Sequence, residues 1–171
     1  KDMENILGKK ITVNENNDTY KDNALEKVRD LYEQIGKKYI CIADDSGISI
    51  DILNSFPGVH TARWLDADDH IKNLELLKKV GNTVKEKRKC HYTTVIALKS
   101  KNFEETFEYV LSGVVSDVAR GENGFGFDEI FELSNGKTLA EISTKEKLKL
   151  SPRKEALDMA NRYLMKFKTE N

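Results

Sequence analysis

The sequence predicts an α/β fold built on a mixed β-sheet. Stretches whose apolar residues recur every three or four positions, as in helices, alternate with short apolar runs that are typical of strands. Two of the strand candidates are separated only by a short polar segment, which predicts an antiparallel pair. The chain has 171 residues, of which 39% are hydrophobic. This length and composition suit one domain or two closely associated lobes.

The first predicted helix spans residues 19–36. Asp18 or Thr19 can cap its start, and Gly36 ends it. Asp22 falls in the first turn, where the helix dipole favours a carboxylate. The predicted buried face consists of Ala24, Leu25, Val28, Leu31, Tyr32 and Ile35.

The next region predicts two short strands on either side of an acidic turn. Residues 39–43 are almost wholly apolar, as in a strand that is buried on both faces. This run ends at Asp44-Asp45-Ser46-Gly47, whose composition is typical of a turn. Apolar alternation then predicts a half-buried strand over residues 48–52, and Pro57-Gly58 marks a further turn.

A second helix is predicted over residues 67–80. Its expected inner face consists of Ile71, Leu74, Leu77 and Val80. Two strands follow, over about residues 90–98 and 106–115, and the polar segment between them predicts the antiparallel pair.

The remaining elements are a glycine-rich loop over residues 121–128, a short strand through Ile130 and Phe131, and a last helix over residues 152–167. Ser151 at the N-cap and Pro152 at the first helical position are a strong start signal for that helix. Its expected buried residues are Ala156, Leu157, Ala160, Leu164 and Phe167.

The composition narrows the class of partner. Net charge is −1, with 28 Lys and Arg against 29 Asp and Glu, which argues against a nucleic-acid polymer as ligand but allows a mononucleotide. The two cysteines, Cys41 and Cys90, predict buried free thiols rather than a disulfide or metal site. The three histidines show no ligand spacing. Without a long apolar run or a signal-peptide pattern, we expect a cytoplasmic protein that does not enter the membrane.

Two short motifs suggest chemistry. Gly124-Phe125-Gly126-Phe127-Asp128 offers two aromatic faces on which a base can stack, and its glycines let the backbone approach a ligand closely. Asp44-Asp45-Ser46-Gly47 offers carboxylates, which are ligands that Mg²⁺ prefers. Together they suit a metal-bound nucleotide. The alternative is structural, because such segments are often turns and apolar residues often pack in a core.

These and further motifs, in this order along the chain, resemble those of the inosine triphosphate pyrophosphatases, which act on non-canonical purine nucleoside triphosphates. The matching segments are Thr19-Tyr20-Lys21-Asp22-Asn23-Ala24-Leu25, Ala43-Asp44-Asp45-Ser46-Gly47, Phe56-Pro57-Gly58-Val59 with Ala62-Arg63, Gly124-Phe125-Gly126-Phe127-Asp128, Thr138-Leu139-Ala140-Glu141, Glu146-Lys147 and Ser151-Pro152-Arg153. The resemblance covers nearly the whole chain from about Asp18 onward. It implies an elongated two-lobed fold with a central cleft, usually as a homodimer. The implied reaction is Mg²⁺-dependent hydrolysis of ITP, XTP and their deoxy forms to the monophosphate and pyrophosphate.

The resemblance also implies individual roles. Asp45 would bind Mg²⁺ with Asp22 and act as general base, while Lys147 would contact phosphate and Arg153 the purine O6 edge or a phosphate. Asp128 would bond to the base or fix its loop. The expected substrate-binding set is Ser46, Phe125, Gly126, Phe127, Asp128, Lys147, Ser151 and Arg153.

Three features depart from the family pattern. The first family strand and its Thr-x-Asn-x-x-Lys phosphate loop have no counterpart in these 171 residues, whose first seven resemble the helix that follows that loop. Asp22 stands where the family has a metal-binding Glu, and Pro152 stands where it has a His. Two alternatives therefore stay open: a nucleotide-binding module without catalysis, and a pyrophosphatase with altered base preference.

Overall fold

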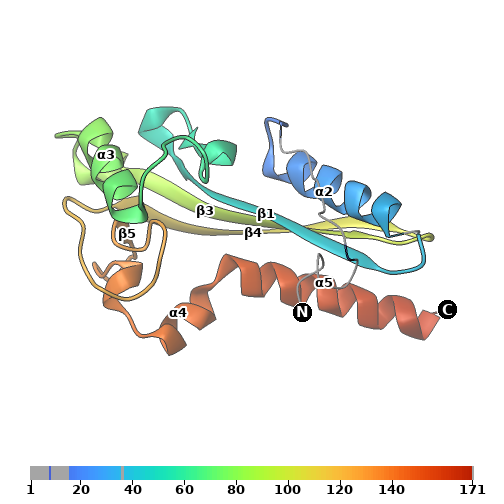
Figure 1. The fold of residues 1–171 in the computed structure, drawn as a ribbon. Coiled ribbons are helices and arrows are strands. Elements are labelled where there is room, and N and C mark those ends of the chain that lie inside the picture. Colours follow the sequence, from blue (N-terminus) through green and yellow to red (C-terminus); the bar gives the residue numbers. More distant parts are fainter. Residues whose placement is uncertain (1–7, 9–15, 36, 171) are drawn as a thin grey trace. The chain divides into compact units, whose positions relative to one another are not determined.

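The computed structural model describes residue 8, residues 16–35 and residues 37–170, and it confirms the α/β class. The helices are α2 (Tyr20–Gln34), α3 (Asp69–Val80), α4 (Thr144–Leu150) and α5 (Pro152–Glu170). The strands are β1 (Cys41–Ile50), β2 (Phe56–Pro57), β3 (Lys89–Lys99), β4 (Glu104–Val115) and β5 (Phe131–Glu132). They form one sheet in the order β2-β1-β3-β4-β5 (Figure 1). The β1–β2 and β4–β5 pairs are antiparallel, and β3 and β4 form the expected hairpin.

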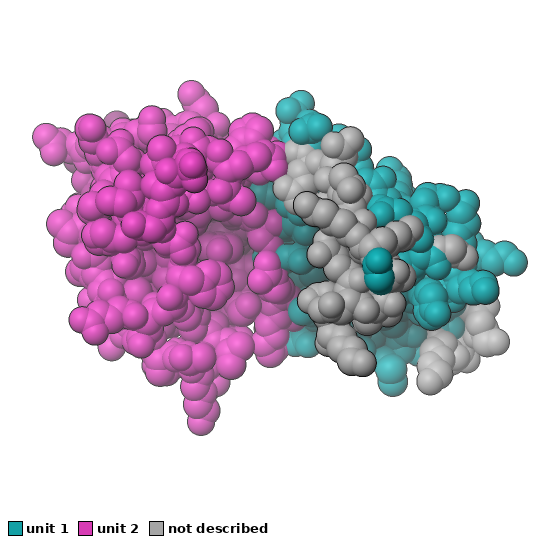
Figure 2. Space-filling model, in the orientation of Figure 1, with its two compact units in different colours: residues 1–45, 94–109, 156–171 teal, residues 46–93, 110–155 magenta. Residues whose placement is uncertain are grey.

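The chain divides into two compact units, coloured separately in Figure 2. Unit 1 comprises residues 1–45, 94–109 and 156–171, and unit 2 comprises residues 46–93 and 110–155. Strands β1, β3 and β4 contribute residues to both units.

Unit 1 packs one helix on each face of the sheet. Side chains alternate between the two faces of a strand, so neighbouring residues of β3 belong to different clusters. Val95 and Ala97 pack in the cluster of α2, whereas Ile96 and Leu98 pack in the cluster of α5. The buried partners are Ala24, Val28, Tyr32 and Cys41 in the first cluster, and Ala156 and Ala160 in the second. This double coverage explains why β3 is so apolar.

Unit 2 has its own core. It is formed by Ile48, Ile50, Leu76, Val80, Cys90, Val115, Phe127, Ile130, Phe131, Leu139 and Ile142. These residues come from β1, α3, β3, β4, β5 and the loops that follow β4 and β5. The loop over residues 121–128 is therefore attached directly to a packed core through Phe127.

The predicted turn at Asp44–Gly47 is wrong. The chain runs through these residues as part of a single strand, β1, instead of two strands separated by a turn. Pairing with β3 outweighs the local turn preference of Asp, Ser and Gly, since strand formation depends mainly on its neighbours. Asp45 is consequently held in a sheet and not on a loop.

The predicted inner face of α3 is only half right. Leu77 and Val80 pack in the core of unit 2 as predicted. Ile71 and Leu74 are 45% and 43% exposed instead, and Asn73 and Leu76 are buried. The helix thus turns a polar side chain inward where periodicity predicted apolar ones. The reason is a set of hydrogen bonds that Asn73 makes, described below.

Helix α4 was not predicted, although its capping box is visible in the sequence. The Ser143 hydroxyl accepts from the backbone of Glu146, and the Glu146 carboxylate accepts in return from the backbone of Ser143. The start of α5 is confirmed: Pro152 is its first residue, and Ser151 Oγ accepts from the Lys154 N–H at 3.3 Å. Thr19 caps α2 as expected, with Asp22 in the first turn.

The other boundaries shift by a few residues, and Leu157 is exposed instead of buried. Both cysteines are buried and free, as predicted. Burial raises the pKa of both thiols, most strongly that of Cys90. The expectations for residues 1–7 and for Gly36 lie outside the described residues. None of the described helices has the length and hydropathy needed to span a membrane.

Candidate active site

The Asp45 carboxylate lies at the centre of a polar cluster in unit 1. Although it is only 9% exposed, both of its oxygens have partners. Lys27 Nζ donates to Asp45 Oδ1 at 2.7 Å, and Asn23 Nδ2 approaches Oδ2 at 3.3 Å. Lys27 Nζ also donates to the Asp44 carbonyl at 3.1 Å. We call Asn23, Lys27 and Asp45 the acidic centre.

Helix α2 presents both partners of Asp45 from one face. Asn23 and Lys27 are four residues apart, so their side chains lie one above the other on the helix. Asn23 is completely buried, and its Oδ1 accepts from the Asn17 N–H at 3.1 Å, which fixes the orientation of the amide. The predictions named Asp45 but missed Lys27. The available signal was a polar pair at this spacing on an otherwise apolar helix face.

The acidic centre fits a hard cation such as Mg²⁺. Asp22 precedes Asn23 in α2, and its carboxylate is exposed and accepts from the Thr19 hydroxyl at 2.6 Å. A carboxylate has about four acceptor positions, so the contacts to Lys27 and Asn23 leave Asp45 capacity for a metal. No group of three or more His, Cys, Asp or Glu suited to a metal occurs among the described residues. Mg²⁺ is compatible with so few ligands, because it commonly binds one or two carboxylates plus waters and substrate phosphates.

A second cluster in unit 2 surrounds the glycine-flanked loop. Asp128 is buried, and its Oδ2 accepts from Lys147 Nζ at 2.6 Å and from the Phe125 N–H at 3.0 Å. The Asp128 carboxylate therefore fixes the loop, as one of the two predicted alternatives stated. Gly124 has φ +108°, and a Cβ there would overlap both Asp128 Oδ2 and Lys147 Nζ. Only glycine leaves room for this ion pair.

The two phenylalanines of the loop differ sharply. Phe127 is 4% exposed and packs in the core of unit 2, so the core-packing alternative is confirmed for it. Phe125 is 70% exposed, and Lys147 Nζ lies 5.8 Å from the centre of its ring. An exposed ring with a cation beside it can stack on a flat aromatic ligand, whereas a buried ring cannot.

The remaining predicted residues take defined places. Ser46 follows Asp45 in β1 and is half-buried. Ser151 lies between α4 and α5, where it caps the second helix, and Arg153 is exposed in the first turn of α5. The structure brings Phe125, Asp128 and Lys147 together in unit 2.

The matched motif Thr138-Leu139-Ala140-Glu141 has a structural role. Thr138 and Glu141 form a capping box, and Thr138 Oγ1 donates to the Arg120 carbonyl at 2.8 Å. Arg120 also bridges Glu132 and Glu141. The Thr138 N–H bond and the Arg120 ion pair lower the pKa of Glu141. Burial alone would raise the pKa of Glu132, but bonds from Lys85 and Arg120 outweigh it and the pKa is lowered. Ala140 bonds through its backbone to Asn123 and Asp128, so this network supports the loop.

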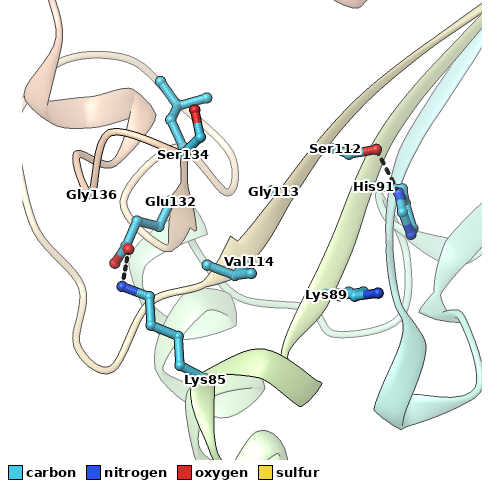
Figure 3. A pocket seen from close by; sticks show the side chains of 10 residues that line it. Lys85, Lys89, His91, Ser112, Gly113, Val114, Glu132, Ser134 and Gly136 are labelled. Carbon is cyan, nitrogen blue, oxygen red and sulfur yellow. Dashed lines mark hydrogen bonds and ion pairs between the residues drawn. The ribbon is translucent and has the colours of Figure 1, made fainter.

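A separate groove of about 550 Å³ lies in unit 2 (Figure 3). Its lining includes none of the predicted site residues. Lys85 and Glu132 form an ion pair on one side, and His91 Nδ1 is 3.1 Å from Ser112 Oγ on the other. His91 Nε2 is 3.2 Å from Asp51 Oδ1. Each of these side chains is thus paired with another side chain of unit 2.

The structure therefore defines an α/β protein with a buried carboxylate–lysine centre in one unit and an exposed aromatic ring beside an ion pair in the other. The model of the Ham1 family matches residues 1–163. A dITP/XTP pyrophosphatase from Thermoanaerobacter sp. (strain X514) is 41% identical over 163 residues, covering 94% of this chain and 81% of that protein.

Solved structures of Ham1 proteins and of a dITP/XTP pyrophosphatase are similar to this chain in fold. The Ham1 protein of Staphylococcus aureus has a TM-score of 0.87 at 30% identity, covering 95% of this chain and 84% of that one. A nucleoside-triphosphatase / dITP/XTP pyrophosphatase from Mycobacterium abscessus has a TM-score of 0.76 at 35% identity, covering 87% and 77%. The chain belongs to the Ham1 family.

Proposed function

We propose that this protein hydrolyses dITP and XTP, and also ITP, to the nucleoside monophosphate and pyrophosphate in a Mg²⁺-dependent reaction. The observation that carries the proposal is the acidic centre, a nearly buried carboxylate between an ammonium and an amide. The relatives named dITP/XTP pyrophosphatases support the same chemistry and make the chain an enzyme of nucleotide metabolism.

Asp45 would take the proton of the attacking water. The water oxygen forms a bond to the α-phosphorus, the bond from that phosphorus to the bridging oxygen breaks, and pyrophosphate leaves. The position of Asp45 within a sheet fixes the carboxylate, and Asn23 and Lys27 orient its oxygens. General-base catalysis of this kind contributes about 10²–10⁴ in rate. Mg²⁺, held by Asp45 and Asp22, would neutralise phosphate charge when bound.

Substrate recognition would fall to unit 2. Phe125 offers its exposed ring to the base, and Lys147 can donate to phosphate while it remains paired with Asp128. Arg153 presents donors only, which favours the O6 acceptor of hypoxanthine and xanthine over the amino group of adenine. Ser46, adjacent to Asp45, can donate from its hydroxyl to phosphate. The backbone of Gly126 and the cap residue Ser151 are the other members of the proposed site. Phe127 supports the loop from the core.

A panel assay tests the proposal. Pyrophosphate release is measured for XTP, dITP, ITP, GTP and ATP with and without Mg²⁺, and the monophosphate is identified by chromatography. We expect Mg²⁺-dependent turnover of the first three.

Asp45→Asn should lower kcat by about 10²–10⁴ without unfolding the protein, while Asp66→Asn, at an exposed position, serves as the charge-matched control. Release of pyrophosphate by Asp45→Asn at the wild-type rate would refute the assignment of Asp45. Turnover of GTP and ATP as fast as that of XTP, dITP and ITP would refute the proposed selectivity.

The proposal also includes a homodimer in the cytoplasm. The family resemblance supports the homodimer, and the nucleotide substrates named for the relatives suit the cytoplasm. Sedimentation equilibrium of the purified protein measures the assembly directly, and a monomer at micromolar concentration would contradict it.

A further inference from the structure

Two side chains of helix α3 form hydrogen bonds with both backbone polar groups of Gly126. Asp69 Oδ2 accepts from the Gly126 N–H at 2.7 Å, and Asn73 Nδ2 donates to the Gly126 carbonyl at 2.9 Å. Asp69 and Asn73 are four residues apart and therefore lie on one face of the helix. We call these two side chains the α3 clamp. None of the matched motifs includes either residue.

Asn73 occupies its buried position at a cost to stability. The side chain is 0% exposed, and Nδ2 also lies 3.2 Å from Glu129 Oε2, so two acceptors fix the orientation of the amide. Its Oδ1 is buried and has no hydrogen-bond partner among the described residues. Leaving a buried acceptor without a hydrogen bond destabilises the folded protein, and an apolar residue at this position of the helix would avoid that cost. The contribution of this side chain therefore lies in its hydrogen bonds to Gly126 and Glu129.

The clamp acts where the loop needs support. Gly126 has φ +62°, a left-handed conformation, and follows Phe125, whose N–H is already bound by Asp128. Four consecutive polar groups of the loop backbone are thus fixed, because the Phe125 carbonyl also accepts from the Asp128 N–H at 3.3 Å. The ring between them is 70% exposed and gains little from packing. These bonds fix the backbone from which this ring projects.

We propose that Asp69 and Asn73 are positioning residues that preorganise Phe125 for stacking on the base of the substrate. The inference rests on the proposed nucleotide substrate, but the clamp itself can be tested without one. A preorganised ring loses less conformational freedom on binding, so the clamp strengthens binding of the base and leaves the phosphate chemistry unchanged.

The first experiment measures amide hydrogen exchange of peptides covering residues 121–128 in the ligand-free protein. Asp69→Ala and Asn73→Leu should each accelerate exchange in this segment, because each removes a bond to Gly126. Asp69→Asn keeps an acceptor oxygen and should restore part of the protection. Glu75→Ala, on the same helix, is the matched control and should leave exchange unchanged. Wild-type exchange in both clamp variants would overturn the clamp, whether or not the protein turns over nucleotides.

The second experiment separates binding of the base from catalysis. In Asp69→Ala and Asn73→Leu, KM for XTP should rise by about three- to tenfold, the worth of one net hydrogen bond, with kcat nearly unchanged. Inorganic tripolyphosphate, which has no base, should inhibit all variants equally. A faster exchange combined with an unchanged KM would show that the clamp is structural only and would overturn the positioning role.

If the wild-type protein hydrolyses no nucleotide, the proposed function fails, and affinity for XMP measured by calorimetry replaces KM. Should Asn73→Leu fail to fold, Asp69→Ala at the exposed end of α3 decides both experiments.

Discussion

Asp45 and Lys27 depend on each other, because removing either side chain leaves the charge of the other without this partner. The ammonium of Lys27 and the carboxylate of Asp45 are both mostly shielded from water, and they approach to 2.7 Å. A charge in such surroundings is expensive unless it is paired. The pairing therefore contributes to the stability of unit 1 as well as to the proposed chemistry.

A double-mutant cycle measures this coupling. Lys27→Met should lower the free energy of unfolding by about 3 kcal/mol, because it leaves the Asp45 charge without its ammonium partner. Adding Asp45→Asn should recover part of that loss, since the amide carries no charge. The measurement is urea unfolding of the wild type, both single variants and the double variant. Lys21→Met, at an exposed position of α2, is the control, and a coupling energy under about 0.5 kcal/mol would contradict the pairing.

At the scale of residues, the sequence motifs identify side chains that cluster in the structure better than the side chains that orient them. Asp45, Phe125, Asp128 and Lys147 stand in recognisable motifs, and the last three do come together. Asn73 and Phe127 could not be assigned in the same way. Whether a polar residue of a helix points inward, or which of two aromatic rings is buried, depends on contacts with segments far away in the sequence.

At the scale of elements, the glycine-flanked loop depends on a close approach that only glycine permits. Gly124→Ala should lower stability by about 1–3 kcal/mol and raise KM, because a methyl group would displace the Lys147–Asp128 ion pair. Gly136→Ala is a matched control: Gly136 also has positive φ, at +80°, but no atom lies within 4 Å of the place that an alanine methyl group would occupy there. The difference in melting temperature between the two variants isolates the clash from the backbone strain. Equal losses of stability and an unchanged KM would argue against the ion pair as the reason for the glycine.

The start of α5 offers a test of base preference. Pro152 is the first helical residue, directly before the exposed Arg153, and histidine can also occupy that position, although the preset φ of proline is lost. If proline has relaxed selectivity, Pro152→His should raise the ratio of kcat/KM for ITP over ATP by roughly 2- to 150-fold, the worth of one hydrogen bond to a neutral or charged partner. The nucleotide panel measures the ratio, and thermal unfolding controls for the helix start. An unaltered ratio with intact stability would mean that Pro152 takes no part in reading the base.

Elements with strong local signals were predicted well, and those governed by neighbouring strands were not. Cap residues identified the starts of α2 and α5, because a cap acts within one turn of its helix. The continuous strand β1 was missed, since Asp, Ser and Gly favour turns locally and only the pairing with β3 keeps them extended. Helix α4 is an exception among the helices, because it was not predicted although Ser143 and Glu146 form a local capping box.

At the scale of the whole molecule, the α/β class follows from periodicity, but the composition of the two units does not. Each unit combines segments that are distant in the sequence, and three strands contribute to both. Apolar alternation predicts that one face of a strand is buried, but it does not predict which helix packs on that face. In unit 1, that information comes from the two clusters on opposite faces of β3.

Carboxylates with lowered pKa values make the folded state sensitive to acid. Hydrogen bonds from Arg29, and then from Lys99, lower the pKa of Glu104 from 4.5 to about 2. The Ser143 hydroxyl and N–H lower the pKa of Glu146, and the pKa values of Glu132 and Glu141 are lowered as described above. A group whose pKa is lower in the folded state binds fewer protons there than in the unfolded chain. Its stabilising contribution is therefore present above the unfolded-state pKa of about 4.5 and is lost as the pH falls through the lowered folded-state pKa, which is about 2 for Glu104.

Glu104 allows this effect to be measured at one site, because it joins α2 to the β3–β4 hairpin within unit 1. Arg29 Nε donates to both of its oxygens at 3.0 and 3.1 Å, and Lys99 Nζ lies 2.9 Å away. At neutral pH, Glu104→Gln should lower the free energy of unfolding by about 1 kcal/mol, since the site is only partly shielded from solvent. The difference from wild type should shrink as the pH falls from 4.5 toward 2, where Glu104 becomes protonated. Urea unfolding followed by circular dichroism at several pH values tests this, with Glu108→Gln on the same strand as control. A difference that stays constant over that range would show that the ion pairs of Glu104 do not set its pKa.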